Sequence, residues 1–197
     1  MRTVIVTNIA SIDGYYAAED GNPMALNMDE AFDAYNRERI CAADVVLLGR
    51  TSFLGFSSYW PFVADAPADP ADRALSQDNR ETSRAYNRLP KVVVSDTLNV
   101  LEDNPWHSTT TVVPRASITG ELDRLRTGGD GDVLVFASHL LWNALLAARL
   151  VDELHLMVSP NALGAGIPLI TGPAQLALLG TRTFDGSDNV LLRYAAR

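Results

Sequence analysis

The sequence has 197 residues, of which 47% are hydrophobic and 20% charged, and its formal net charge at pH 7 is −8. These totals suit one large domain or two small ones, and the lack of a long linker favours a single domain over residues 1–197. The net negative charge excludes a protein that wraps nucleic acid, because such a protein needs a continuous stripe of basic residues on its surface.

Two further classes are excluded by composition. A single cysteine excludes a disulfide framework within the chain and a zinc cluster of cysteines. No apolar stretch reaches the roughly 18 residues that a membrane span requires, and the N-terminus lacks the features of a signal peptide. We therefore expect a cytoplasmic protein without membrane contact.

The first third of the chain alternates strand-like and helix-like segments. Val, Ile and Thr dominate residues 2–11, which predicts a strand. Residues 27–43 predict a helix capped by Asn27, with Cys41 as a small buried residue near its end. The apolar run over 44–49 predicts a central strand that is buried on both faces.

Residues 54–75 combine aromatic residues, prolines and aspartates, a composition typical of an irregular lid or binding loop. The remaining predicted elements are a helix over 76–89, strands over 91–95 and 108–114, a helix over 117–126 capped by Ser117, a strand over 132–137, a helix over 138–150, and strands over 152–160, 180–185 and 189–195. This order predicts an α/β fold with a mainly parallel central sheet and an antiparallel C-terminal edge.

Ligands of open α/β sheets collect at the carboxyl ends of the strands, and one such end carries unusual chemistry. Four residues follow the buried strand directly: Gly49, Arg50, Thr51 and Ser52. Glycine permits a tight turn, the N–H groups of a helix start attract anions, and arginine grips phosphate through two parallel hydrogen bonds. The alternative is a capped helix with a surface arginine.

Two other strand ends carry small or polar residues. Ser95 follows an apolar strand, where its hydroxyl either binds a ribose or phosphate or simply closes a turn. Ala137 and Ser138 close another strand; small residues there permit a ligand to approach the backbone amides, and Ser138 suits a plain helix cap equally well.

Asp13 and Gly14 follow the first strand and suit a tight turn. Asp13 could instead orient a polar substrate or assist proton transfer. The three histidines show no metal-ligand spacing, so no metal site is expected.

Five segments in this order resemble one family from end to end: "SIDGYYA", "VVLLGRTSF", "KVVVSDTL", "DVLVFASHLL" and "LVDELHLMVSPNALGAGIPLI". The chain is similar to the C-terminal reductase domain of the bifunctional riboflavin-biosynthesis deaminase/reductase, which shares the dihydrofolate reductase fold. The resemblance implies a three-layer α/β/α domain, usually a homodimer, that binds NADPH across the strand ends.

The resemblance also implies roles for individual residues. Asp13 lies near the substrate as the candidate catalytic residue, and Ala10 approaches the nicotinamide. The cofactor phosphates are held by Gly49, Arg50, Thr51 and Ser52, the adenosine ribose and its 2′-phosphate lie near Ser95, and the pyrophosphate loop is formed by Ala137, Ser138, His139 and Leu140.

The chain departs from the family pattern at two places. Ala137 and Ser138 stand where the pyrophosphate loop of the family carries two glycines, and Phe136 stands where riboflavin reductases place a glutamate for the substrate. Because a phenyl ring cannot bind what a carboxylate binds, we expect a substrate other than the ribosylaminopyrimidine phosphate of riboflavin synthesis.

We therefore expect an NADPH-dependent reductase that transfers hydride to a small heterocyclic substrate, pterin- or pyrimidine-like, or to a carbonyl or imine. Asp13 or an ordered water would supply the proton. The alternative is a non-catalytic protein of the same fold that binds a nucleotide or small ligand, which Phe136, Ala137 and Ser138 favour. A flavin-using protein is a third, less favoured interpretation.

Overall fold

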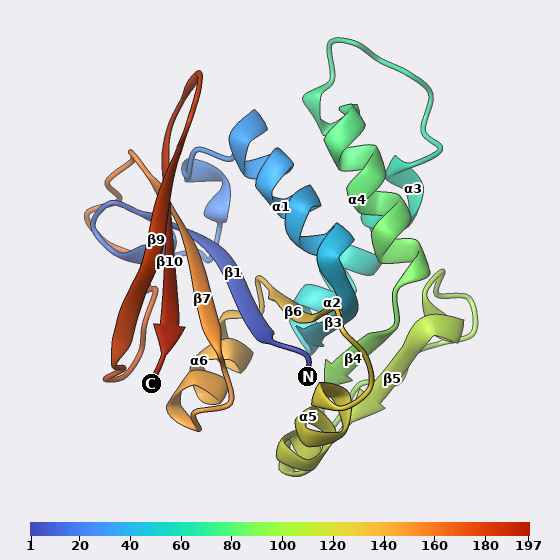
Figure 1. The fold of residues 1–197 in the computed structure, drawn as a ribbon. Helices are drawn as coiled ribbons and strands as arrows, with labels where there is room; N and C mark the ends of the chain where they lie inside the picture. The colour runs from blue at the N-terminus through green and yellow to red at the C-terminus, as the bar shows by residue number, and fades with distance from the viewer. The chain divides into compact units, whose positions relative to one another are not determined.

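The computed structural model describes all residues, 1–197, and contains two compact units (Figure 1). Unit 1 consists of Met1–Thr3 and Ala34–Ser138, and unit 2 consists of Val4–Asp33 and His139–Arg197. Each unit has its own set of paired strands. The expectation of a single domain over residues 1–197 stays a prediction.

Unit 1 contains four parallel strands in the order β5-β4-β3-β6. Their bounds are β3 Ala43–Gly49, β4 Lys91–Val94, β5 Thr110–Val113 and β6 Asp132–Phe136. In β3, Val46, Leu47 and Leu48 are fully buried. Successive side chains of a strand point to opposite faces, so the prediction that this strand is covered on both sides is confirmed.

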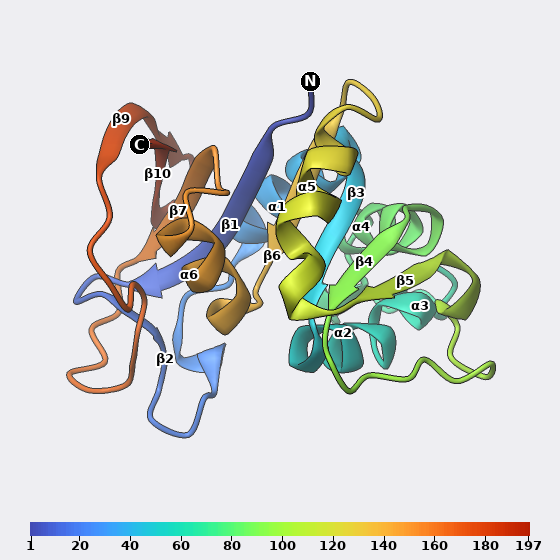
Figure 2. The ribbon, with the colours of Figure 1, turned by 90° about the horizontal axis from the view of Figure 1, so that it is seen from below.

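Helices surround the strands of unit 1. Their bounds are α1 Glu30–Ala42, whose first residues belong to unit 2, α2 Arg50–Ser57, α3 Trp60–Val63, α4 Gln77–Arg88 and α5 Ile118–Arg126, with short 3₁₀ helices at Arg73–Leu75, His107–Thr109 and Arg115–Ser117. Figure 2 shows α5 on one face of these strands and α4 on the opposite face. Unit 1 therefore has the three layers that the sequence predicts.

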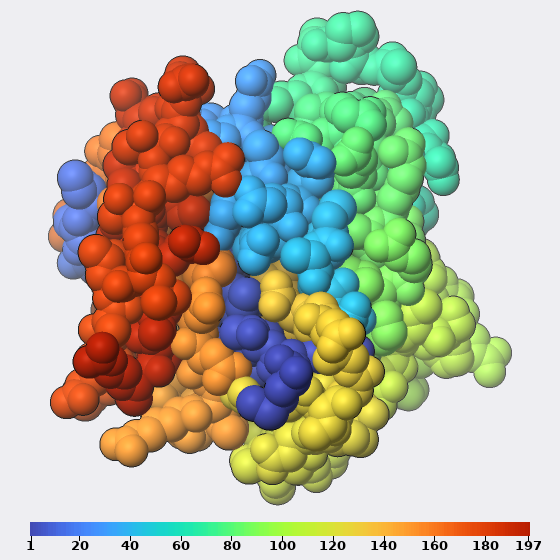
Figure 3. Space-filling view, in the orientation of Figure 1, coloured from blue at the N-terminus to red at the C-terminus, as the bar shows by residue number.

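The N-terminal residues are held within unit 1 by Arg2. Its Nε and Nη1 donate to Asp44 Oδ2 and to the Leu125 carbonyl oxygen, each at 3.0 Å. In Figure 3 these residues, in dark blue, lie against the yellow segment that contains the end of α5 and the turn after it.

The segment 54–75 is more regular than its composition indicates. Residues up to Ser57 continue α2, and α3 follows, so the expectation of a wholly irregular excursion is wrong for its first part. Arg80 of α4 holds the backbone that follows α3. Its Nη1 donates to the carbonyl oxygens of Ala64 at 3.0 Å and Ala66 at 2.9 Å.

Unit 2 contains the strands β1-β7-β10-β9 in that order. β1 Val4–Ser11 is parallel to β7 Glu153–Ser159, whereas β10 Ser187–Ala196 is antiparallel to both β7 and β9 Leu176–Phe184. The expected antiparallel edge at the C-terminal end is confirmed.

Unit 2 also contains a short 3₁₀ helix at Pro23–Ala25 and three other small elements, of which the sequence predicted only the helix α6. The other three are α6 His139–Ala147 and the short paired strands β2 Tyr15–Ala17 and β8 Ile167–Pro168. A helix that crosses a bilayer would need greater length and more apolar character than any helix of this structure has.

Three local predictions are wrong. Asp29, not Asn27, caps α1, because Asp29 Oδ1 accepts a hydrogen bond from the Phe32 N–H at 3.1 Å. Ser117 makes no side-chain capping bond to α5. Cys41 is exposed rather than buried, since the last turn of α1 presents it to solvent.

An aromatic cluster forms the core of unit 1 beside β4. Tyr86 is 2% exposed, and its ring centroid lies 5.4 Å from that of Trp60, 5.5 Å from that of Trp106 and 5.9 Å from that of Phe136. The ammonium group of Lys91 lies 4.6 Å from the Trp106 ring centroid, and Lys91 is 1% exposed. The only lysine of the chain is thus part of this core.

Burial makes the stability of the fold depend on the charge of Lys91. It lowers the pKa of Lys91 from 10.5 to about 8. Between these values the folded protein binds fewer protons than the unfolded chain, so the free energy of unfolding should rise with pH. The destabilising contribution is fully present below pH 8 and vanishes above 10.5.

Urea unfolding at a series of pH values measures this rise, and Lys91→Met should flatten it because methionine fills similar space without a charge. An equal pH slope in the wild type and the variant would contradict the prediction. Selective labelling of the single lysine gives the pKa independently by NMR.

Candidate functional site

The start of α2 lies at the carboxyl end of β3. Gly49 ends the strand and precedes the helix, and it offers no side chain to cap the first N–H groups. Arg50 and Thr51 are exposed, and Arg50 makes no ion pair in a chain whose net charge is −8. A cation without a partner beside uncapped helix N–H groups makes this end of β3 locally attractive to anions.

The loop after β6 has an unusual backbone. Ala137 has φ 45° and Ser138 has φ 53°, both in the left-handed region that glycine occupies readily. A residue other than glycine in this region costs about 1–3 kcal/mol, and such residues are retained where surrounding contacts hold the backbone in place. Within this loop, the two residues for which the resemblance implies glycine both have a left-handed backbone.

Two serine hydroxyls hold this loop against the start of α2. Ser138 Oγ accepts a hydrogen bond from the Gly49 N–H at 3.0 Å. The Ser138 N–H in turn donates to Ser52 Oγ at 2.9 Å. Because β3 and β6 are paired neighbours, the reciprocal bonds link two adjacent strand ends. The structure therefore brings Gly49, Ser52 and Ser138 together.

Ser95 follows β4, the other neighbour of β3. Its Oγ accepts hydrogen bonds from the N–H groups of Thr97 at 3.2 Å and Leu98 at 3.0 Å. The sequence left two roles open for the Ser95 hydroxyl, which were binding a ribose or phosphate and closing a turn. These contacts display the turn.

Asp13, in unit 2, holds a turn. Its Oδ1 accepts from the Leu163 N–H at 3.1 Å, and its Oδ2 accepts from the Gly164 N–H at 2.7 Å. A hydrogen bond from the Ser11 side chain, followed by the one from the Gly164 backbone, lowers the pKa of Asp13 below its ordinary value. The group is therefore an ionised acceptor at neutral pH, a state that cannot donate a proton.

His139 also serves the local structure of unit 2. Its Nε2 lies 2.8 Å from the Pro168 carbonyl oxygen and 3.0 Å from that of Leu169, so we assign the ring proton to this nitrogen. The ring stacks on Tyr16 with centroids 4.7 Å apart. Leu140 is 83% exposed at the start of α6.

Ala10 lies one residue before the carboxyl end of β1. It is 1% exposed and sits opposite Val158 of β7 in the strand register. Ala10, Asp13, His139 and Leu140 thus belong to unit 2, whereas the other predicted cofactor residues, Gly49, Arg50, Thr51, Ser52, Ser95, Ala137 and Ser138, belong to unit 1.

Sequence reasoning missed a partly buried polar network in unit 2. Asp29 accepts hydrogen bonds from Ser187 Oγ at 2.6 Å and from Asn189 Nδ2 at 3.0 Å, and Ser159 Oγ accepts from the Asn27 N–H at 2.9 Å. Burial raises the pKa of Asp29, but the hydrogen bonds that it accepts outweigh burial and lower it. Ser187 and Asn189 follow Asp29 by more than 150 residues, so no local pattern signals the network.

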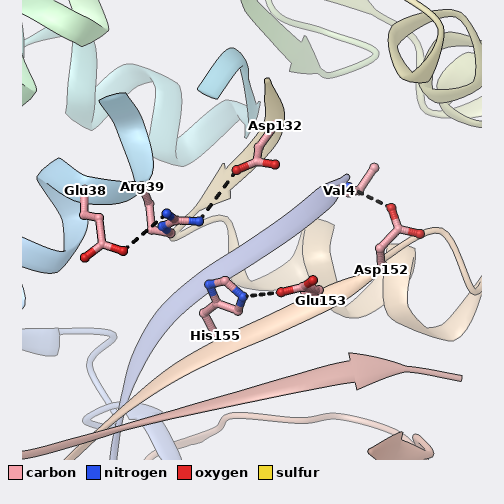
Figure 4. Close-up of polar contacts among 7 residues, drawn as sticks. All are labelled: Val4, Glu38, Arg39, Asp132, Asp152, Glu153 and His155. Carbon is pink, nitrogen blue, oxygen red and sulfur yellow. Dashed lines mark hydrogen bonds and ion pairs between the residues drawn. The ribbon is translucent and has the colours of Figure 1, made fainter. Parts of the chain in front are cut away.

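Several charged groups near the amino ends of the strands make ion pairs or hydrogen bonds within the protein (Figure 4). In unit 1, Arg39 lies 3.6 Å from Asp132 Oδ2 at the start of β6. In unit 2, Glu153 Oε2 lies 2.7 Å from Nε2 of the buried His155, and Asp152 Oδ2 accepts from the Val4 N–H at 2.7 Å.

Comparison with known proteins gives a consistent result. The sequence pattern of the RibD C-terminal domain matches residues 2–190. An uncharacterized protein of Bacillus subtilis (strain 168), YyaP, is 24% identical over 186 residues, which cover 93% of this chain and 89% of that protein.

Two solved structures show the same fold. One is a diaminohydroxyphosphoribosylaminopyrimidine deaminase/5-amino-6-(5-phosphoribosylamino)uracil reductase from Thermotoga maritima, with TM-score 0.65 and 14% identity over 100% of this chain and 57% of that one. The other is Enterococcus faecalis dihydrofolate reductase complexed with NADP(H), with TM-score 0.60 and 12% identity over 99% of this chain and 96% of that one. The predicted dihydrofolate reductase-like fold is confirmed.

Removal of the Ser138 hydroxyl should destabilise unit 1. Ser138→Ala leaves the Gly49 N–H without its acceptor, so the free energy of unfolding should fall by about 1–2 kcal/mol in urea titrations. Thr51→Ala, at an exposed neighbouring position, is the matched control and should change it by less than about 0.5 kcal/mol. Equal stability of the two variants would show that the hydrogen bond to the Ser138 hydroxyl does not stabilise unit 1.

Proposed function

Because the chain belongs to the RibD C-terminal domain family, we propose that it is an NADPH-dependent reductase that transfers hydride to a small heterocyclic substrate, pterin- or pyrimidine-like, or to a carbonyl or imine. Membership of this family and the dihydrofolate reductase-like fold support a reductase-type function. The observation that carries the proposal is the left-handed Ala137–Ser138 turn fastened to the start of α2.

The residues at the ends of β3 and β6 fit a dinucleotide pyrophosphate chemically. Arg50 and the first N–H groups of α2 supply donors, and Thr51 adds an exposed hydroxyl. The side chains of Ala137 and Ser138 are small, and the bond from Ser138 to Ser52 holds the loop in place without a bulky group. When bound, NADPH supplies the hydride, and these residues bind and orient it.

Phe136 bears on the choice of substrate. It is 6% exposed, and its ring packs 5.9 Å from that of Tyr86 within the aromatic cluster of unit 1. An apolar ring in the place of the family's glutamate offers no acceptor to a polar substrate. We therefore propose a substrate other than the ribosylaminopyrimidine phosphate.

Asp13 enters the proposal as a positioning residue. Both of its carboxylate oxygens accept backbone N–H groups of the turn at Leu163 and Gly164, and its pKa is lowered, so water is the better candidate for the proton donor. A homodimer and a cytoplasmic location, both expected from the sequence, remain predictions; sedimentation would test the first.

A non-catalytic binding protein is the second candidate, favoured by the same Phe136 and by side chains at both left-handed positions. Such a protein would bind a nucleotide, the cofactor included, or another small ligand without turnover.

The absorbance of reduced nicotinamide, followed with a panel of pterins, pyrimidines and imines, separates the two candidates. We expect NADPH oxidation with at least one substrate, and cofactor affinity should fall about tenfold in Arg50→Gln, because a charge-assisted hydrogen bond is lost. Arg124→Gln, which removes a surface arginine paired with Glu121, is the control. Binding without oxidation would favour the second candidate, and calorimetry without heat for reduced or oxidised cofactor would refute the reductase.

The role of Asp13 has its own test. Asp13→Asn should lower turnover by loosening the turn at Leu163 and Gly164, while the pH dependence of kcat between about pH 5 and 9 stays unchanged. Loss of an ionisation from that pH profile in the variant would instead assign proton transfer to Asp13.

A further inference from the structure

The last three strands of the sheet in unit 2 have one uncharged face. β7, β10 and β9 are neighbours in that order (Figure 1). Residues that pair across neighbouring strands have side chains on the same face of the sheet. One set of paired residues contains only apolar side chains and two threonines, and we call it the open face. Its members are Leu154, Leu156 and Val158 of β7, Val190, Leu192, Tyr194 and Ala196 of β10, and Leu176, Leu178, Thr181 and Thr183 of β9.

The charged residues of these strands lie outside the open face. Glu153, Arg182 and Arg193 are each adjacent along their own strand to a residue of the open face. Because successive side chains of a strand point to opposite faces, these three belong to the other face of the sheet. Asp188 lies in the register shift at the start of β10. The charge is therefore segregated to one side of the three strands.

The two faces also differ in burial. On the charged side, the apolar residues are covered by the rest of unit 2, since Met157 is 2% exposed and Leu191 is 1% exposed. On the open face, Leu156 and Leu192 are only half-buried, and Leu178 is 59% exposed. A contiguous apolar surface of this kind, left in contact with water, is typical of a protein-binding site.

The outer edge of β9 is a less suitable place for a partner. β9 is the last strand of the sheet, so this edge has no strand beside it. The register between β9 and β10 shifts at Arg193 and Tyr194, which leaves Leu179 as an extra residue in β9. A bulge bends its strand and twists the edge away from pairing with another strand. We therefore expect a partner to cover the open face and not to extend the sheet.

The charge of the chain narrows the choice of partner. A protein with a net charge of −8 is repelled as a whole by nucleic acid and by anionic membranes. Two copies of the chain repel each other too, but least where charge is balanced. The β9–β10 hairpin, residues 176–196, carries two arginines and two aspartates and is neutral.

A second copy of this chain matches the open face, because it presents the same uncharged, apolar surface. We propose that two copies pack their open faces against each other about a two-fold axis, as the two sheets of a β-sandwich do at a separation of about 10 Å. Dimerisation through this face is independent of the proposed reductase activity.

The size of the open face suits the centre of such an interface. The nine residues of β9 extend about 30 Å, and three strands span about 14 Å, which gives a footprint of about 400 Å². A standard interface buries about 800 Å² on each partner, with an apolar centre and a polar rim. The open face can therefore supply the apolar centre, and the ends of the strands can supply the rim.

Sedimentation velocity of the full chain over a range of concentrations tests the proposal. The wild type should form a dimer with Kd about 1 μM or tighter. Leu178→Glu and Thr181→Glu should each raise Kd at least tenfold, because the two-fold axis buries the new carboxylate of both copies in an apolar interface. Both positions are exposed, and circular dichroism of each variant checks that it folds.

Leu101→Glu is the matched control, because it adds the same charge at a leucine of unit 1 that is 61% exposed. A wild-type dimer that both open-face variants weaken and the control leaves unchanged supports the proposal. A wild type that stays monomeric up to about 100 μM overturns it. So does a dimer that folded open-face variants leave intact, or one that the control weakens equally.

Discussion

The reciprocal bonds between Ser138 and the start of α2 are the constraint on which the candidate site depends. The Gly49 N–H reaches Ser138 Oγ at 3.0 Å, and the Ser138 N–H reaches Ser52 Oγ at 2.9 Å. Without these bonds, the left-handed backbone at Ala137 and Ser138 would have little to offset its cost. The serine side chain that makes the conformation costly also supplies the hydroxyl that holds it, so the loop keeps a glycine-like shape without glycine.

Charged side chains at the two ends of the strands differ in how they are paired. Near their amino ends, several charged groups are paired within the protein, as in the contact of Arg39 with Asp132 and that of Glu153 with the buried His155. At the carboxyl ends of β3, β4 and β5, Arg50 has no ion pair and Arg115 has only a solvent-exposed one. Internal pairing serves stability, whereas groups left available to solvent can bind a charged ligand at small cost.

Unit 2 uses its polar residues differently. Asp13 accepts two backbone N–H groups of a turn, and His139 donates to the carbonyl oxygens of Pro168 and Leu169. Asp29 likewise accepts several hydrogen bonds from residues distant in sequence. These hydrogen bonds hold segments of unit 2 that are distant in sequence in fixed positions.

The sequence by itself determined the longer strands and helices, because buried apolar runs such as 44–49 and periodic segments such as 118–126 encode them locally. It missed the short elements α3, β2 and β8. It also predicted which strand ends would bind an anion, since Gly49–Ser52 and Ala137–Ser138 are contiguous motifs. Only the tertiary structure decided what these side chains do. The partners of Ser138, Asp13 and Asp96 lie 86, 151 and 19 residues away, and the chain must fold before such groups meet. The prediction of the α1 cap was wrong for the same reason. Asp29 rather than Asn27 caps α1, because the hydrogen bonds from Ser187 and Asn189 hold that carboxylate in place.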